Sequence, residues 1–278
     1  MSRLLTIIIA LSSVYQIAGA DVVVKYKSKA EITNRILLKT ESAYYIKGDK
    51  NYSELKTNFS APKESGTPFD IISKGITRLD RGIHWSLLSS KYSEETIASM
   101  HDSIGQAGEY NWTFNVTPIS DKDKIKKFTC FGQIGKAVGV GINDPADTVY
   151  LTFEQWSTDD TSSGRELMSY EDSFTKASAI HKMWSQEHIA TYLEKGYGAQ
   201  FEKLSDLMGE RRGISIKSFF QIERTILYDE ASNRKGTGKH PKDGGNWKLF
   251  SMTNELVSIE DKKIDSDKFE IPANYEKK

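Results

Sequence analysis

The chain has 278 residues, of which 38% are hydrophobic and 27% are charged, with 38 basic and 38 acidic side chains. This balance produces no long-range attraction to nucleic acid, so a nucleic-acid partner is not expected. The single cysteine, Cys130, excludes an intramolecular disulfide, and we expect it to be buried as a small hydrophobic side chain.

The first twenty residues, MSRLLTIIIALSSVYQIAGA, have the pattern of a secretory signal peptide. Arg3 precedes an apolar run that is too short to span a bilayer, and the segment closes on the small residues Ala18-Gly19-Ala20. We therefore expect residues 1–20 to be removed and residues 21–278 to form one exported domain, in the bacterial periplasm or outside the cell. No later stretch is apolar for long enough to form a transmembrane helix.

Apolar and polar residues alternate from Asp21 onward. Val22, Val24 and Tyr26 fall on one side of the segment, whereas Lys25 and Lys27 fall on the other. This period of two predicts a half-buried strand of an antiparallel sheet. Further strands are expected at 44–46, 76–79, 83–88, 110–118, 126–142, 148–156 and 216–228, and a last pair of strands over 247–259.

The stretch GITRLDRGIHWSLL (75–88) brings together Asp80, His84 and Ser86, which are the residue types of a hydrolytic site. Turn residues at 80–82 lie between two short apolar runs, however, and this arrangement predicts a β-hairpin. No Gly-x-Ser-x-Gly nucleophile elbow occurs in the chain. We therefore assign no catalytic residue and expect no enzyme activity, and a hydrolase built on Asp80 and His84 is the weakest of three hypotheses.

The sequence GKAVGVGI places Ala137, Gly139 and Gly141 on one face of a predicted strand. The glycine order does not fit a phosphate-binding loop. A strand with one face of small residues indicates that a helix or a ligand packs closely against its backbone.

One region has the pattern of an amphipathic helix. Ile180, Trp184, His188 and Tyr192 recur every four residues, which predicts a helix over 174–193, and a shorter one is expected over 201–208. Strands on both sides of this helical insertion (about 173–208) predict an α+β fold. It would consist of one large, curved antiparallel sheet with the insertion packed on it.

His181 and His188 raise the question of a metal site. Seven residues of helix separate them by roughly 10.5 Å along the axis, which is too far for both to bind one ion. No metal site and no cofactor are therefore expected.

Large aromatic side chains are the candidates for lining a hydrophobic ligand site. The candidates are Trp85, Trp112, Trp156, Trp184 and Phe220. The loop 232–245 adds a basic group, Arg234, Lys235 and Lys239, which could contact anionic lipid headgroups at a membrane surface. The same loop could equally be a solvated hairpin tip.

The end of the chain, NELVSIEDKKIDSDKFEIPANYEKK (254–278), resembles the closing segment of an exported bacterial family known only as a domain of unknown function. Phe269, Glu270, Ile271, Pro272 and Tyr275 match its final motif. YIKGDK (45–50) and ITRLDRGIHWSL (76–87) resemble its early strands. Such proteins are similar to the LolA-like periplasmic lipoprotein-carrier superfamily. That resemblance implies an open half-barrel with helices over its concave side and acyl chains held between them, and it carries over no catalytic residue.

Two hypotheses of different classes follow for the function. The first is an exported, non-enzymatic protein that binds a lipid or acyl chain between the sheet and the helix, with peripheral membrane contact. The alternative is an interaction or structural module with a filled core and no ligand, whose function lies on the outer face or in the loop 232–245. The sequence identifies no protein partner.

Overall fold

The computed structural model describes residues 21–32, 36–60, 68–103, 110–159, 164–178, 197–208, 213–226, 228–229, 234–235 and 245–278. The predicted signal peptide and most of the helix predicted over 174–193 lie outside these residues. No helix within the described ranges is long and apolar enough to cross a membrane.

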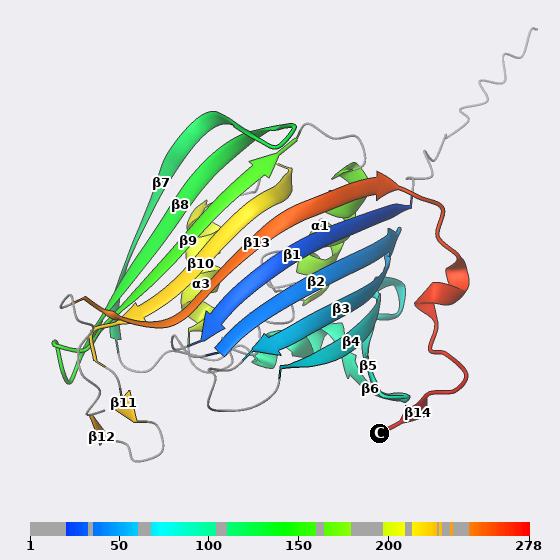
Figure 1. Cartoon of the computed structure of the whole chain (residues 1–278), viewed down its shortest axis with the longest axis horizontal. Helices are drawn as coiled ribbons and strands as arrows, with labels where there is room; N and C mark the ends of the chain where they lie inside the picture. Colours follow the sequence, from blue (N-terminus) through cyan, green and yellow to red (C-terminus); the bar gives the residue numbers. More distant parts are fainter. Residues whose placement is uncertain are drawn as a thin grey trace, which may run out of the picture.

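The described residues form one 12-stranded sheet and a separate two-stranded ribbon, β11-β12 (Figure 1). The strand order in space is β14-β6-β5-β4-β3-β2-β1-β13-β10-β9-β8-β7. The strands are β1 (Val22–Ile32), β2 (Ile36–Lys47), β3 (Lys50–Ser60), β4 (Phe69–Arg78), β5 (Ile83–Leu88), β6 (Lys91–Thr96), β7 (Tyr110–Ile125), β8 (Phe128–Gly141), β9 (Thr148–Thr158), β10 (Ile214–Arg224), β11 (Tyr228–Asp229), β12 (Arg234–Lys235), β13 (Trp247–Asp261) and β14 (Glu276–Lys277). All neighbours are antiparallel except β14 and β6.

Among the described residues, the helices that follow β9 are α1 (Gly164–Ser178) and α3 (Gly198–Met208). The same residues include the 3₁₀ helices η1 (Leu79–Arg81), η2 (Ile97–Ser103) and η4 (Ser266–Phe269). The predicted fold, a large curved antiparallel sheet with a helical insertion packed on it, is confirmed.

The element bounds differ from the sequence predictions in several places, and the strand pair predicted over 247–259 is the single strand β13. Strand β3 was not predicted, because its polar-rich sequence KNYSELKTNFS follows a turn. Strand β4 begins at Phe69, and not at 76. Helix α1 begins ten residues before Phe174, and its buried face, which includes Leu167, Tyr170 and Phe174, has helical spacing that surrounding polar residues conceal.

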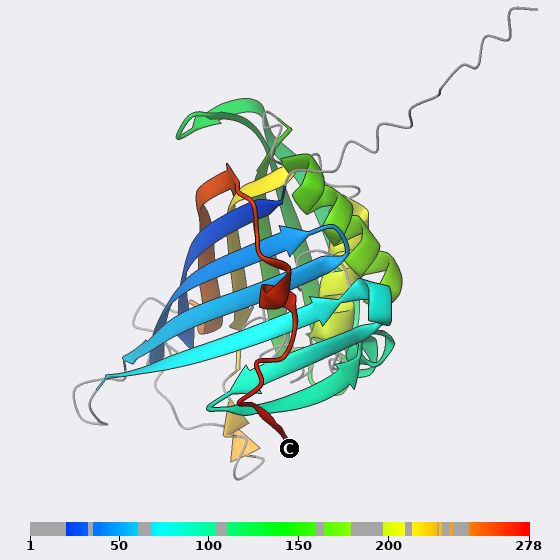
Figure 2. The ribbon, with the colours of Figure 1, turned by 90° about the vertical axis from the view of Figure 1, so that its right-hand side faces the viewer.

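Both helices pack on the same face of the sheet, which is the concave face (Figure 2). Val22 and Val24 point to this face and join the cluster under α1, which includes Leu167 and Phe174. Val23, between them, points to the opposite, outer face and joins a different cluster. The strict alternation of side chains along a strand explains this division.

The small-residue face of β8 is covered as its sequence predicted. A Cβ atom added to Gly135 would lie 2.9 Å from Met208 Sδ and 3.0 Å from Leu204 Cδ1, both on α3. A Cβ atom added to Gly139 would lie 2.8 Å from the ring of Trp112. Helix α3 and an aromatic ring therefore occupy the space that the missing side chains leave.

A C-terminal strap, residues 262–278, crosses the outer face of β1–β6 (Figure 2). Ile264 and Phe269 are buried there in a cluster with Val23, Ile76 and Trp85. The strap ends in β14, which pairs with the edge strand β6.

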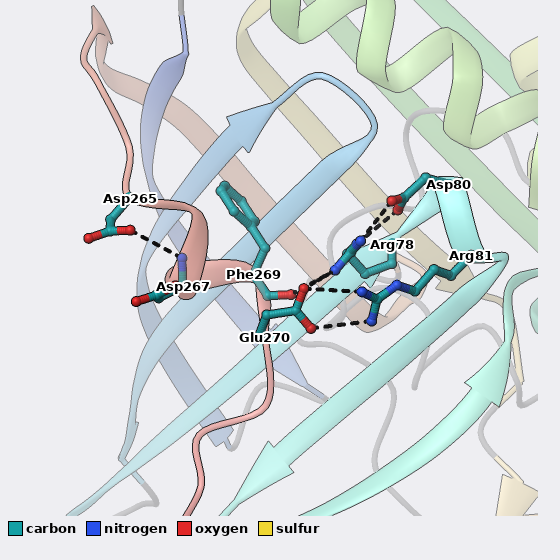
Figure 3. Close-up of polar contacts among 7 residues, drawn as sticks. All are labelled: Arg78, Asp80, Arg81, Asp265, Asp267, Phe269 and Glu270. Carbon is teal, nitrogen blue, oxygen red and sulfur yellow. Dashed lines mark hydrogen bonds and ion pairs between the residues drawn. The ribbon is translucent and has the colours of Figure 1, made fainter.

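Asp21 and Lys47 hold the strap at its first turn. The backbone N–H of Ile264 donates to Asp21 Oδ2 at 2.7 Å, and its carbonyl accepts from Lys47 Nζ at 2.8 Å. Further on, Asp265 caps η4 by accepting from the backbone N–H of Asp267 at 3.2 Å, and this turn directs Phe269 into the sheet (Figure 3).

Ion pairs fix the middle of the strap to the turn after β4 (Figure 3). The guanidinium of Arg78, only 5% exposed, donates to Asp80 Oδ1 at 2.8 Å and Oδ2 at 2.7 Å, and it also pairs with Glu270. Arg81 pairs with the same Glu270 at 3.2 Å. The hydrogen bonds from Arg78 hold the pKa of Asp80 below its usual range. The sequence Asp80-Arg81-Gly82 is thus a turn, as predicted, with Gly82 at a φ of 67°.

We expect Gly135→Val to lower the free energy of unfolding by about 1–3 kcal/mol, because the added side chain overlaps Met208 and Leu204. Urea denaturation measures this change. The control is Gly245→Val, since a Cβ atom at Gly245 has nothing within 4 Å. Equal stability of the two variants would contradict the close packing of α3 on β8.

We expect Phe269→Ala to lower the free energy of unfolding by about 3–5 kcal/mol, because its side chain is fully buried beneath the strap. Val257→Ala, at a 45% exposed position of β13, should change stability by about 0.5 kcal/mol or less. Thermal or urea unfolding compares the two. A small effect of Phe269→Ala would mean that the strap is not part of the cooperative fold.

Candidate functional site

The concave face carries two parallel rows of side chains that cross the strands. Directly opposed residues in neighbouring antiparallel strands point to the same face, so the register defines each row. The apolar row consists of Phe153, Phe220, Met252, Ala30, Leu38, Phe59 and Phe69 on β9, β10, β13, β1, β2, β3 and β4. The polar row lies one repeat along the same strands and consists of Gln155, Ser218, Asn254, Ser28, Thr40 and Thr57 on β9, β10, β13, β1, β2 and β3.

Helix α3 covers the first half of the apolar row. Phe153, Phe220, Met252 and Ala30 are all at most 5% exposed. The ring of Phe201 on α3 meets that of Phe220 edge to face, with centroids 4.1 Å apart. This part of the concave face is therefore a filled core.

The second half of the apolar row is open. Leu38 and Phe59 are half-buried, and Phe69 is 56% exposed although its ring stacks on that of Phe59 at 4.9 Å. Ile36 and Ile71 lie beside them on the same face, 38% and 39% exposed. We call these five residues the open end. A contiguous exposed apolar patch of this kind is typical of a binding surface.

The polar row separates the α3 cluster from the α1 cluster. Ser28 Oγ donates to Asn254 Oδ1 at 2.8 Å, and the hydroxyls of Thr40 and Thr57 are 3.0 Å apart. Gln155 is 4% exposed, and its Nε2 has no hydrogen-bond partner among the residues that the structure describes. Buried amide donors are nearly always paired, so this group is an exception that calls for a physical reason.

A charged cluster closes the far end of the α3 core. Tyr110 donates to Asp147 Oδ2 at 2.8 Å, and Arg224 Nε donates to Asp147 Oδ1 at 2.6 Å. Arg224 also donates to the Tyr110 hydroxyl at 2.7 Å. Burial, together with the hydrogen bond to Asp147, raises the pKa of Tyr110, so its hydroxyl stays protonated. Because the three groups satisfy one another, the cluster joins β7, β10 and the turn before β9.

His84 and Asp80 do not form a hydrolytic pair. His84 Nδ1 lies 2.9 Å from the Thr77 hydroxyl and its Nε2 lies 3.3 Å from Ser86 Oγ, whereas Asp80 is bound by Arg78. Burial lowers the pKa of His84 to about 4, which makes it a weak base. Both ring nitrogens of His84 thus lie near hydroxyl groups, an arrangement that does not favour activation of Ser86.

Of the five aromatic residues predicted to line one ligand site, the four that the structure describes lie in three separate clusters. Trp85 lies on the outer face, under the strap, because the register of β5 turns it away from the concave face. Trp156 packs against the α1 cluster, and its ring would lie 2.4 Å from a Cβ atom at Gly132. Phe220 and Trp112 belong to the α3 cluster, where Phe220 is buried under Phe201. Trp184 lies outside the described residues.

The basic loop remains a prediction. Arg234 and Lys235 form β12, which pairs with β11. Lys239 lies outside the described residues, as do His181 and His188. Within the ranges that the structure covers, no three His, Cys, Asp or Glu side chains are grouped so as to hold a metal ion. Cys130 is buried, as expected.

Sequence reasoning missed the open end and the polar row. Phe59 and Phe69 lie in strands whose polar or loop-like sequences concealed them. Gln155 lies on the same buried side of β9 as Leu151 and Phe153. A glutamine that continues this apolar alternation was the one signal in the sequence that could have indicated the polar row.

No protein-family model matches the chain, and no curated protein matches it. Among solved structures, a LolA superfamily protein from Nitrosomonas europaea is similar at 7% identity, covering 91% of this chain and 90% of that chain with a TM-score of 0.25. A β-barrel-like protein of a domain of unknown function from Brucella abortus is similar at 9% identity, covering 88% of this chain and 98% of that chain with a TM-score of 0.24. These are the kinds of protein that the C-terminal sequence resembles. The fold assignment itself rests on the strand pairing described above.

We expect stability to fall as the pH decreases from about 6.5 to about 4. His84 has a pKa of about 4 in the folded protein and an ordinary value of 6.5, so the unfolded chain takes up the proton first. The stabilisation from the neutral buried imidazole is complete above pH 6.5 and is lost as the pH falls towards 4, a change of about 3 kcal/mol. Urea titrations across this range should give a flatter profile for His84→Asn. An identical slope in that variant would contradict the assignment.

Proposed function

We propose that this chain is an exported, non-enzymatic protein that binds a hydrophobic ligand, a lipid or an acyl chain, on the concave face of the sheet. The single observation that carries the proposal is the apolar row, which α3 covers at one end and which continues as the exposed open end at the other. The residues that bind are Leu38, Phe59, Phe69, Ile36 and Ile71.

Burial of alkyl surface would drive binding. Each methylene group removed from water contributes up to about 0.8 kcal/mol, so affinity should rise with chain length until the chain extends beyond the patch. The rings of Phe59 and Phe69 stack with parallel planes and centroids 4.9 Å apart, so each ring helps to hold the other in place at the open end. Few polar contacts are then needed to set orientation.

Export of the chain to the bacterial periplasm belongs to the same proposal and rests on the signal-peptide pattern of residues 1–20. Contact of Arg234, Lys235 and Lys239 with anionic headgroups would bring the protein to a membrane surface, where such ligands are found.

A second candidate is the interaction or structural module. The observation that favours it is the contact between Phe201 and Phe220, which fills the concave face under α3. In that case the open end would be only the edge of a filled core. The two candidates differ in whether the purified chain takes up an uncharged hydrophobic probe.

We expect Ile71→Gln to weaken binding of N-phenyl-1-naphthylamine, an uncharged fluorescent hydrophobic probe, by at least about fivefold, because the ligand would bury an unpaired amide. Ile72→Gln is the matched control. It replaces the same residue type one position along β4, at a 52% exposed site on the outer face, and should leave binding unchanged. Equal loss in both variants, or in neither, would remove the open end as the site.

Native mass spectrometry of the exported chain, with organic extraction, identifies any bound lipid. A lipid that is released on denaturation supports the carrier function. A chain that carries no lipid and takes up neither the probe nor added fatty acid would favour the interaction module.

A further inference from the structure

The two edges of the 12-stranded sheet are built differently. The edge strand β6 is charged, with Lys91, Glu94 and Glu95 in its short sequence KYSEET. The chain also covers the beginning of this strand with β14, where the backbone N–H of Glu276 donates to the carbonyl of Ser90 at 3.0 Å. Charged side chains and a covering segment are common ways in which proteins prevent an edge strand from pairing with another chain.

The opposite edge, at β7, is uncharged in its first half. Among the described residues β7 pairs with β8 alone, and Figure 1 shows it at the outer margin of the sheet. The segment Tyr110–Pro118, YNWTFNVTP, contains no charged residue and no proline before its last position. It is rich in aromatic and β-branched residues, which favour extended strands. We call residues 110–118 the β7 edge.

The backbone of the β7 edge is regular. Its register with β8 is unbroken from Tyr110 opposite Gly141 to Pro118 opposite Gln133, and the first irregularity comes after Pro118. In an antiparallel pair, alternate residues direct their N–H and C=O groups towards the partner strand, and those between them direct theirs to the other side. The β7 edge therefore presents an evenly spaced row of backbone donors and acceptors on the side away from β8.

The side chains of the β7 edge form two uniform rows. The concave row is apolar and packs against the α3 cluster, and it consists of Trp112, Phe114 and Val116. The outer row is uncharged and exposed, and it consists of Asn111, Thr113, Asn115 and Thr117. A strand that matches this edge has apolar side chains on its concave side and uncharged polar side chains on its outer side.

The β7 edge of a second copy meets this requirement. When two such edges run antiparallel about a twofold axis level with Phe114, facing residues are an even number of positions apart in the sequence, so each row faces itself. Phe114 then faces its own copy, Trp112 faces Val116, and Thr113 faces Asn115. Facing aromatic residues stabilise a strand pair, and no like charges are brought together.

We propose that the chain forms a symmetric dimer through the β7 edge, in which two 12-stranded sheets continue into one another. The partner is a second copy because the segment is complementary to itself in both rows. The open end, which carries Phe59 and Phe69, lies on strands of the other half of the sheet, so the dimer does not depend on the proposed ligand. Pairing of one short segment is a small interface, and we expect a Kd of about 10–100 µM.

Sedimentation equilibrium of residues 21–278, at about 5 to 500 µM, measures the association. We expect a reversible monomer–dimer equilibrium for the unmodified chain. The double variant Thr113→Glu/Asn115→Glu places carboxylates opposite each other at two symmetry-related points, so its Kd should rise by at least about tenfold. The double variant Thr113→Lys/Asn115→Glu places opposite charges at the same points, so its Kd should stay within about threefold of the original value or fall.

The two variants are matched controls for each other. They share Asn115→Glu, which lies opposite Lys136 of the same chain on β8, and they differ only at residue 113. Both positions are exposed on the outer face, so the urea midpoints of the monomers should stay close to that of the unmodified chain. A difference in Kd between the variants therefore reports the contact between the two copies.

A chain that stays monomeric up to about 500 µM would overturn the inference. So would a dimer that both variants weaken equally, or one that neither variant weakens, because the interface would then lie elsewhere. In each of these cases the proposed function would stand, since uptake of the hydrophobic probe is measured separately.

Discussion

The antiparallel pairing of β1 with β13 is the constraint on which the rest of the structure depends. These strands lie in the middle of the sheet, and they join β2–β6 on one side to β10, β9, β8 and β7 on the other. Their register runs from Val22 opposite Asp261 to Ile32 opposite Phe250, with one irregularity at Lys25. Because side chains alternate between faces, a slip of one residue here would turn every core residue of one half towards the wrong side.

The same register produces the two rows of the concave face. Ala30 stands opposite Met252, and Ser28 stands opposite Asn254, so the apolar and polar rows both continue across the junction without a break. A hydrophobic surface of this length is more than α3 covers. The result is a face with a sealed end, where Phe201 meets Phe220, and an open end at Phe59 and Phe69.

The outer face of the sheet is covered in a different way. There the chain uses its own C-terminal strap to cover Ile76 and Trp85, with Phe269 as the buried anchor. Arg78 connects the strap to the turn after β4, and its side chain is almost completely removed from solvent between two carboxylates. Breaking a buried ion pair by removing one partner is costly, so this contact specifies where the strap lies. With the strap occupying the outer face of β1–β6, the exposed apolar patch at the end of the sheet is on the concave side.

Part of this could be predicted from the sequence, because it depends on local patterns. Alternating residues such as Val22, Val24 and Tyr26 predicted antiparallel strands, the small residues from Gly135 to Gly141 predicted a closely packed backbone, and Asp80-Arg81-Gly82 predicted a turn. In each case the physical cause lies within a few neighbouring residues. The strands β3 and β4 were missed or shortened, since their burial comes from neighbours in the sheet and not from their own hydrophobicity.

The site could not be predicted, because it is made of residues that only the register brings together. Aromatic residues were the candidates for the site because they are large. Trp85 and Phe220 nevertheless point to opposite faces of the sheet, and Trp85 lies under the strap. Gln155, Asn254 and Thr57 are about a hundred residues apart along the chain and form one row through six strands. The sequence by itself determined an antiparallel α+β protein with a helical insertion and a signal-peptide pattern, since these depend on periodicity. Which side chains share a face, and which of them α3 or the strap covers, was decided by the tertiary structure, since long-range pairing sets both.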